Sequence, residues 1–131
     1  ADFIAGFPTE TEEMFENSLR IVDECGLTHL HVFPFSPRPG TPAARMPQLP
    51  RQLVKERGAR LRAKGEEVLG LHLAGEVGKI RPVLIEKEGL GRTEQFTQVE
   101  LSGGSAGDIL TTRITGHTGR HLLGEVLSRA A

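Results

Sequence analysis

Apolar and polar positions follow three different patterns along the 131 residues of the chain. Two short apolar runs, at residues 1–6 and 28–35, have the length and composition of β-strands. The segment between them carries apolar residues at intervals of three and four positions, which is the period of a helix with one buried face. A strand, a helix and a second strand therefore predict a βαβ unit, with parallel strands joined by a right-handed crossover.

The ends of this helix carry sequence signals of their own. Thr9 and Glu12 are spaced as a capping box, in which the Thr9 side chain caps the first turn and Glu12 reaches back to it. Gly26 follows the last apolar position and suits the left-handed conformation that ends many helices. We therefore expect a helix that begins just after Thr9 and ends just before Gly26.

The helical period returns over residues 50–74, where Val54, Leu61 and Val68 stand seven residues apart. Glycines at positions 58, 65, 70 and 75 each weaken a helix by about 1 kcal/mol relative to alanine, so breaks or fraying are expected near its end. We interpret residues 51–75 as a helical connector.

Beyond the connector, the apolar runs are short and separated by glycines. They lie at residues 79–87, 96–101, 108–115 and 121–127. Several short strands with glycine turns over about 55 residues predict a small antiparallel OB-like β-barrel. The predicted fold class is therefore α/β for residues 1–50, followed by the connector and by a β-barrel over residues 76–131.

Composition narrows the functional classes. No apolar run approaches the roughly 20 residues that a membrane helix needs, so we expect a soluble, cytoplasmic protein without a membrane partner. The single cysteine, Cys25, excludes an internal disulfide and any metal or cluster site built from cysteines of this chain alone. Cys25 is expected at a helix C-terminus, where the helix dipole disfavours a thiolate, so we interpret it as a packing residue. The chain starts within an apolar run and without Met, which suggests a piece of a longer protein.

The formal net charge of -1 hides an uneven distribution. Residues 1–50 carry 3 basic and 7 acidic groups, whereas residues 51–75 carry 6 basic and 3 acidic groups. The cations of the predicted connector could attract a phosphate backbone, and a solvated helix face explains them nearly as well. They are Arg51, Lys55, Arg57, Arg60, Arg62 and Lys64.

In a βαβ unit, ligands bind at the carboxyl ends of the strands, which here are followed by residues 6–11 and 35–38. Gly6 lets a ligand approach the backbone, and the helix start offers N–H groups to a carboxylate or phosphate, although a plain turn and cap explain these residues as well. Arg38 stands between two prolines, so its guanidinium is either a fixed anion ligand or a solvent-facing charge. His29 and His31 share a strand face, but without a third ligand nearby they fit buried, hydrogen-bonded side chains better than a metal site.

Three segments, read together, carry a family resemblance. They are DFIAGFPTET at residues 2–11, HVFPFSPRPGTPA at residues 31–43 and GRTE at residues 91–94. In this order they resemble the C-terminal part of the radical S-adenosylmethionine methylthiotransferases of the MiaB and MtaB type, over nearly the whole chain. The resemblance implies that residues 1–50 end a partial (β/α) barrel and that residues 76–131 form a TRAM domain, a small β-barrel that binds RNA.

The resemblance also implies the cofactors. The parent protein would use S-adenosylmethionine and two 4Fe-4S clusters, and a radical derived from S-adenosylmethionine would prepare the adenine ring for sulfur insertion and methyl transfer. The cluster cysteines would lie before Ala1, so the chain alone is expected to bind no cluster and to be inactive. Residues that match the strand and loop bordering the S-adenosylmethionine pocket are Ile4, Gly6, Phe7 and Pro8.

Other matched positions concern the substrate side. Arg38 falls in the expected substrate loop. Two positions depart from the family pattern: Thr9 stands where the family usually has Gly, and Phe35 stands where it usually has Tyr. A role for a tyrosyl hydroxyl is therefore absent at position 35.

The expected partner is tRNA. The HVFP opening of the second segment and Lys55-Glu56-Arg57 resemble most the branch that methylthiolates N6-threonylcarbamoyladenosine in the anticodon stem-loop. Relatives act on isopentenyladenosine or on a ribosomal protein, and a non-catalytic RNA-binding module is the alternative from another functional class. The expected RNA contacts are Arg57, Arg60, Arg92, Arg113 and Phe96.

Two further expectations accompany these assignments. Phe96 could stack on a base, whereas a lone phenylalanine in an alternating strand is more often a core residue. A single βαβ unit leaves strand edges and one apolar sheet face uncovered, so self-association of the chain is expected.

Overall fold

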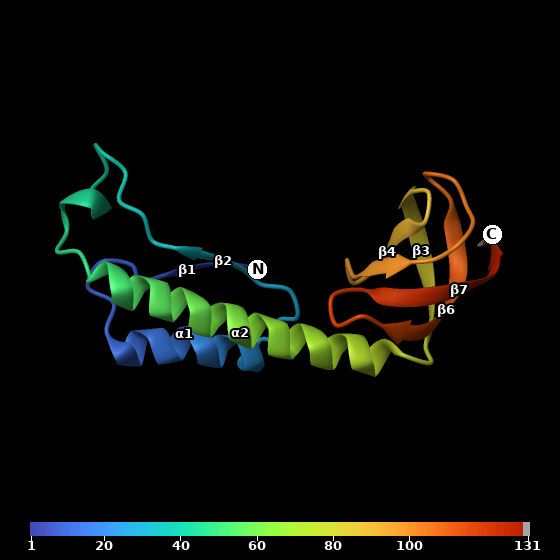
Figure 1. The fold of residues 1–131 in the computed structure, drawn as a ribbon, viewed down its shortest axis with the longest axis horizontal. Coiled ribbons are helices and arrows are strands. Elements are labelled where there is room, and N and C mark those ends of the chain that lie inside the picture. Colours follow the sequence, from blue (N-terminus) through green and yellow to red (C-terminus); the bar gives the residue numbers. More distant parts are fainter. Residues whose placement is uncertain (130–131) are drawn as a thin grey trace. The chain divides into compact units, whose positions relative to one another are not determined.

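The computed structural model describes residues 1–129 and divides into two compact units, Ala1–Val68 and Leu69–Ala131 (Figure 1). The long helix α2 (Arg51–Glu76) runs through the boundary, so each unit contains part of it. No helix among residues 1–129 is both long and apolar enough to cross a membrane. The predicted three-part division at residues 50 and 75 stays a prediction.

The first unit is built on two parallel strands, which confirms the predicted βαβ unit. β1 (Asp2–Ala5) pairs with β2 (His31–Pro34), and α1 (Glu12–Glu24) lies between them in the chain. A loop and a short 3-10 helix, η1 (Ala43–Arg45), lead from β2 to α2.

The two faces of this small sheet have different environments. Successive side chains of a strand point to opposite faces. Ala5 is fully buried in one cluster with Phe15 of α1 and Leu61 of α2. Ile4 and its register partner Phe33 belong to the opposite face and are 56% and 52% exposed. The helices therefore cover one face of the sheet and leave the other uncovered.

The N-terminus of α1 differs from the predicted capping box. Thr11 is the N-cap, and its hydroxyl accepts a hydrogen bond from the Met14 backbone N–H at 3.2 Å. The prediction that Thr9 caps the helix is therefore wrong. Thr9 instead has a φ of 74° in the turn before the helix, and Glu12 is the first helical residue.

The C-terminus of α1 confirms the prediction for Gly26. Its φ is 62°, and its N–H donates to the carbonyl of Asp23. The N–H of Leu27 donates to the carbonyl of Val22. This pair of bonds is a Schellman motif, which satisfies carbonyls that the end of the helix would otherwise leave unpaired.

α2 continues without interruption across its glycines, so the expected breaks are absent. A Cβ at Gly65 would lie 3.3 Å from the Cβ of Leu30, so this glycine admits the segment that precedes β2. Leu61 is buried in the first unit and Leu73 in the second. Packing along both halves stabilises the helix, because tertiary contacts outweigh the low helix propensity of glycine.

The second unit contains a closed barrel of five strands in the order β3–β4–β5–β7–β6, which confirms the predicted OB-like barrel. One neighbouring pair, β5–β7, is parallel, so the barrel is mixed rather than antiparallel throughout. The physical reason is geometric, because directions cannot alternate at every step around a ring of five strands. The strands are β3 (Ile80–Lys87), β4 (Leu90–Thr93), β5 (Gln98–Glu100), β6 (Ile109–His117) and β7 (Leu122–Arg129).

The sequence did not predict β4, because Gly91 was expected to lie in one of the glycine turns between strands. A Cβ at Gly91 would lie 2.5 Å from Cγ1 of Val83 and 2.7 Å from the carbonyl oxygen of Leu84. Glycine is therefore the residue that lets β4 approach β3 closely inside a narrow barrel. The barrel interior is filled by Leu73, Val83, Ile85, Val99, Leu101, Leu110, Ile114 and Leu122.

Candidate functional site

The loop after β1 is held in an unusual backbone conformation. Gly6 has a φ of 80° and Thr9 a φ of 74°, which is a strained value for a residue with a branched side chain. The N–H of Glu10 donates to the carbonyl of Phe7 at 2.9 Å, which closes the turn. The N–H of Gly6 donates to Oε1 of Glu10 at 3.1 Å, so this donor is used within the loop.

Arg57 of α2 anchors this loop from the helix side. Its Nη1 donates to the backbone carbonyl of Glu10 at 2.6 Å and to the Oε1 of the same residue at 3.0 Å. The two side chains are 4% and 10% exposed, so the ion pair is buried. The guanidinium of Arg57 is therefore enclosed and already bound to carboxylates, and the RNA contact predicted for it stays a prediction.

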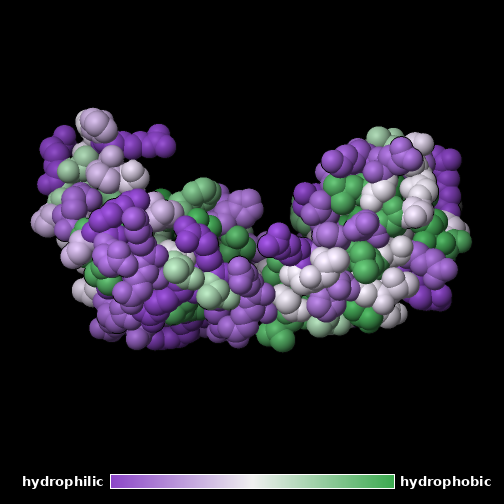
Figure 2. Space-filling model, viewed as in Figure 1, coloured by the Kyte–Doolittle hydropathy of each residue, from purple (hydrophilic) through white to green (hydrophobic). Residues whose placement is uncertain are grey.

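The uncovered sheet face forms one side of a hollow of about 520 Å³ in the first unit. Figure 2 shows apolar surface in the region of β1 and β2, above the helices. Ile4 and Phe33 supply apolar wall, and Arg38 supplies a guanidinium that makes no hydrogen bond or ion pair within residues 1–129. The full lining is Ile4, Phe33, Pro34, Phe35, Ser36, Arg38, Thr41 and Ala43.

The loop that carries Arg38 is ordered by its own turn. The hydroxyl and the N–H of Thr41 both donate to the carbonyl of Arg38, at 2.7 and 3.2 Å. The ring of Phe35 meets the ring of Phe7 edge to face, with centroids 5.3 Å apart. The carboxyl ends of β1 and β2 therefore meet on the same side of the hollow, as expected for parallel strands.

Of the four residues predicted to border the S-adenosylmethionine pocket, only one lines the hollow. Ile4 lines the hollow, and Phe7 contacts the hollow residue Phe35. Gly6 and Pro8 do not line it. A Cβ at Gly6 would lie 2.8 Å from both methyl carbons of Val54, so the space beside this glycine is filled by α2 rather than left for a ligand.

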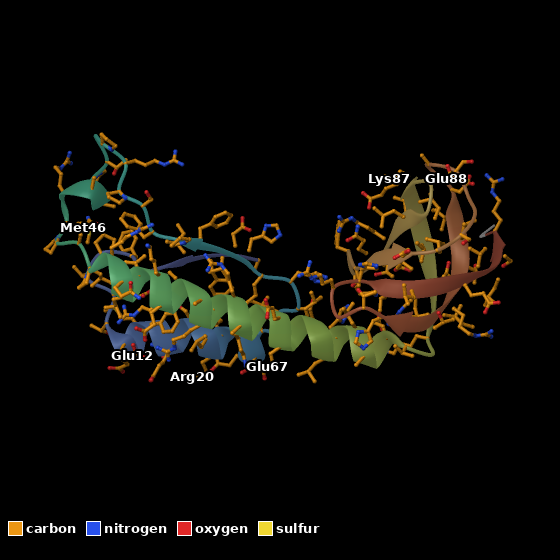
Figure 3. The ribbon with its side chains drawn as sticks, viewed as in Figure 1. Glu12, Arg20, Met46, Glu67, Lys87 and Glu88 are labelled. Carbon is orange, nitrogen blue, oxygen red and sulfur yellow. The ribbon has the colours of Figure 1, made fainter. Side chains whose placement is uncertain are left out.

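The acidic start and the basic connector of the sequence meet across α1 and α2. Arg60 donates to Glu12 at 2.6 Å and lies 4.6 Å from the centroid of the Phe15 ring. Lys64 donates to Asp23 at 2.8 Å. Figure 3 shows Glu12 at the start of α1. Several of the basic side chains that suggested a phosphate partner are therefore paired with acidic side chains of the same unit.

These ion pairs shift the ionisation of their members. The hydrogen bond from Arg60 lowers the pKa of Glu12 below its ordinary value, and Arg57 adds to this effect. The hydrogen bond to Asp23 raises the pKa of Lys64. Both helices therefore keep their charges at neutral pH, and the pairs remain formed.

In the barrel, Phe96 is 76% exposed and has a φ of 63°, so the interpretation of Phe96 as a core residue is wrong. It lies at the edge of a mainly apolar groove of about 510 Å³. Arg92 donates to Glu86 at 2.7 Å and to the carbonyl of Phe96 at 3.1 Å, which holds its guanidinium beside the groove. The groove is lined by Pro82, Leu84, Glu86, Arg92, Thr93, Glu94, Phe96 and Ile109.

The other basic barrel residue from the sequence analysis, Arg113, lies on β6 opposite Ile80 of β3 and Glu125 of β7. It is exposed and makes no ion pair within residues 1–129. Unlike Arg57 and Arg60, it keeps its full charge available to an anionic partner.

The histidines and the cysteine do not converge on a metal site. Within residues 1–129, no three side chains of His, Cys, Asp or Glu are grouped so that they could hold a metal ion. Cys25 is exposed, so the interpretation of Cys25 as a packing residue is wrong. His29 bonds to the hydroxyl of Thr28. His31 is exposed, with Nδ1 3.7 Å from Oδ1 of Asp2, so the expectation that it is buried is wrong.

Comparison with known proteins identifies similar chains. The threonylcarbamoyladenosine tRNA methylthiotransferase MtaB of Rickettsia prowazekii (strain Madrid E) is 50% identical over 101 residues, which cover 77% of this chain and 24% of that protein. A tRNA-2-methylthio-N(6)-dimethylallyladenosine synthase of Erythrobacter litoralis (strain HTCC2594) is 38% identical, over 99% of this chain and 31% of that protein. The ribosomal protein uS12 methylthiotransferase RimO of Synechococcus sp. (strain JA-3-3Ab) is 36% identical, over 98% of this chain and 31% of that protein.

These relatives confirm the resemblance to methylthiotransferases that the three sequence segments indicated. The chain spans between 24% and 31% of the length of these relatives. No protein-family model matches the chain.

Proposed function

We propose that this chain is the C-terminal, substrate-side part of a cytoplasmic tRNA methylthiotransferase that acts on N6-threonylcarbamoyladenosine in the anticodon stem-loop. The observation that carries the proposal is the 50% identity, over 77% of the chain, to a threonylcarbamoyladenosine tRNA methylthiotransferase. A βαβ unit with one uncovered face, followed by a closed OB-like barrel, supports a division into a cofactor side and an RNA side.

The hollow of the first unit fits S-adenosylmethionine in its chemistry. Ile4 and Phe33 offer apolar surface to an adenine ring, and Arg38 offers a charge-assisted contact to a carboxylate. S-adenosylmethionine would supply the methyl group and the radical chemistry of the reaction. The chain's own residues would bind and orient it, and the apolar wall would exclude water from one side of the reacting groups.

The iron–sulfur clusters are a different case. The described residues offer no ligand set for a cluster, and Cys25 is exposed at a helix end. We therefore propose that the chain by itself holds no cluster and is inactive. Anaerobic reconstitution of the isolated chain with iron and sulfide tests this, since a stoichiometric cluster absorbance would contradict it.

The barrel is the proposed RNA surface. OB-folds bind nucleic acids over their second and third strands and beside the loops that join strands 1–2 and 4–5. These strands are β4 and β5 here, and Figure 3 shows Lys87 and Glu88 at the first of the two loops. Arg92 of β4 and the unpaired Arg113 are proposed phosphate contacts of the barrel, and Phe96 is a proposed stacking platform. The half-exposed Arg60 of the first unit is a proposed phosphate contact of its own.

The substrate can be tested in cells that lack their own methylthiotransferases. The full-length protein is expressed there, and tRNA nucleosides are separated and weighed by mass spectrometry. We expect the 2-methylthio derivative of N6-threonylcarbamoyladenosine, and the full-length Arg38→Ala variant should form less of it than the wild type. A methylthio group on an isopentenylated adenosine, or on a ribosomal protein, would instead assign one of the alternative substrates.

A non-catalytic RNA-binding module gives a different result in the same experiment. No methylthio product would form, while the full-length protein would still bind tRNA with a salt dependence typical of phosphate contacts.

The uncovered sheet face with Ile4 and Phe33 supports our expectation that the isolated chain self-associates. Light scattering tests this directly, and a monomer would contradict it.

A further inference from the structure

Two arginines of α2 hold the carboxyl ends of both strands in the first unit. Arg51 donates from Nη1 to the carbonyl of Phe35, one residue after β2, at 2.9 Å. Arg57 donates to the backbone and side chain of Glu10, in the loop after β1, at 2.6 and 3.0 Å. The Arg51 contact therefore fixes backbone of the hollow itself, and the Arg57 contact fixes the loop whose Phe7 packs against Phe35.

The contact with Glu10 acts directly on the strained loop. The same Oε1 that accepts from Arg57 also accepts the N–H of Gly6, so one carboxylate oxygen joins the two ends of the loop to α2. The left-handed conformation of Thr9 is unfavourable by itself and persists only where surrounding contacts hold it. Here the loop is held by the hydrogen bonds of Glu10 and by the methyl groups of Val54, which pack beside Gly6.

Stability alone is a weak explanation for this buried pair. Desolvation of two charges offsets most of their attraction, so apolar residues of similar volume often stabilise a fold equally well. In addition, Nε of Arg57 is buried without a hydrogen-bond partner within the described residues. What apolar residues could not provide is a directed contact to the Gly6 N–H and to the Glu10 carbonyl. The pair therefore specifies a loop geometry.

We propose that Glu10 and Arg57 are positioning residues, which hold the loop at residues 6–10 so that Phe7 stays against Phe35 beside the ligand-binding hollow. The inference rests on the proposed function, because it takes the hollow as the S-adenosylmethionine site. Neither residue lines the hollow, so both act through the loop and the ring pair. Phe35 is the member of the ring pair that lines the hollow. The loop holds Phe7 against the ring of Phe35 and so fixes the position of Phe35.

The test uses the full-length, cluster-loaded protein and S-adenosylmethionine as the probe. Equilibrium dialysis measures its dissociation constant, and hydrogen–deuterium exchange measures the protection of residues 5–11. We expect Glu10→Ala to weaken binding by about tenfold or more, since small misplacements of positioning groups have effects of this size, and to raise exchange in the loop. Glu10→Gln keeps an oxygen acceptor for the Gly6 N–H, so it should restore most of the affinity.

Two controls separate positioning from loss of stability. Asp23→Ala removes the ion pair between α1 and Lys64 of α2, at a distance in sequence from the loop, and should leave the dissociation constant unchanged. Leu61→Ala destabilises the same unit from its core without touching the loop. If Leu61→Ala weakens binding as much as Glu10→Ala does, the role of Glu10 is structural and the inference is overturned.

The remaining outcomes are also decisive. If the wild type binds S-adenosylmethionine and Glu10→Ala binds it equally well, the inference fails while the proposed function stands. If the wild type does not bind S-adenosylmethionine, the proposed function fails and the inference falls with it. Weaker binding and faster loop exchange in Glu10→Ala, with rescue by Glu10→Gln and no effect of Asp23→Ala, support the inference.

Discussion

The two units of this protein are stabilised in different ways. The barrel closes on itself, so every strand has two neighbours, and its interior is filled by apolar side chains such as Val83, Ile114 and Leu122. The βαβ unit has a sheet of two strands, a small core around Phe15 and Leu61, and one uncovered face. Ion pairs between α1 and α2 add to that small core.

This difference shows where a ligand surface can exist in the chain. A closed barrel satisfies its own backbone groups and hides its core, so it can offer only its outer surface. An open sheet keeps unpaired strand edges and exposed side chains such as Ile4 and Phe33. The first unit therefore presents a hollow against its sheet face, whereas the barrel offers a groove on its outer surface, beside Phe96.

The largest loss of stability in the first unit is expected when Arg57 is replaced. In Arg57→Ala, the buried Glu10 carboxylate loses its partner, and we expect the first unit to lose about 3–5 kcal/mol of stability. Urea unfolding followed by peptide-resolved hydrogen exchange measures each unit separately. The matched control is Lys64→Ala, whose partner Asp23 is largely exposed, and which should cost about 1 kcal/mol or less. Equal losses of stability in the two variants would show that the buried ion pair contributes no more than the exposed one.

The barrel should respond most to loss of apolar volume. Ile114→Ala on β6 leaves a cavity in the closed core, and we expect about 3 kcal/mol of destabilisation in the barrel strands. Ile109→Ala on the same strand removes a side chain that is 47% exposed, so its cost should stay below about 1 kcal/mol. Denaturant unfolding of both variants checks the ratio. A larger loss in Ile109→Ala would mean that the barrel exterior contributes more than its burial indicates.

One buried carboxylate makes the second unit sensitive to acid. Glu76 is 2% exposed and bonds to Arg81 at 2.8 and 3.1 Å, and these bonds lower its pKa below the ordinary value of 4.5. The resulting stabilisation is complete above pH 4.5, where the unfolded carboxyl is already ionised, and is lost as the pH falls through the lower folded pKa.

Thermal melting between pH 6 and pH 3 measures this loss. Glu76→Gln should start less stable and change less over the same pH interval, because its amide does not titrate. A variant that keeps the full pH dependence of the wild type would assign the acid sensitivity to other groups.

The smallest effect on stability is expected at Phe96. Because this ring is 76% exposed, Phe96→Ala should change the free energy of unfolding by about 0.5 kcal/mol or less. If the ring stacks on a base, the same variant should weaken tRNA binding by about 1–3 kcal/mol. Thermal melting and tRNA titration at fixed salt concentration give both values. Unchanged affinity would exclude Phe96 from the RNA surface, and Arg113→Ala then tests the phosphate contact independently.

Local patterns predicted the local structure well. The parallel strand pair, the helix end at Gly26, the long helix after Pro50 and the OB-like barrel all follow from apolar period and from glycine. The cap of α1 is Thr11 rather than Thr9, although only Thr9 has the spacing of a capping box, because Thr9 has a left-handed backbone conformation and Thr11 an extended one. β4 was missed since Gly91 serves packing rather than a turn.

Short-range periodicity and contiguous motifs sufficed to predict the βαβ unit, the long helix, the barrel and the resemblance to methylthiotransferases, whereas β4 and the N-cap of α1 followed only from the folded backbone. Only the tertiary structure decided which charges are free. Arg57, Arg60 and Arg113 look alike in the sequence, yet the first is buried against Glu10, the second is paired with Glu12 and the third is exposed and unpaired within residues 1–129. The physical reason is that an arginine's partner lies up to 48 positions away in the chain, so its availability is set by how the helices pack.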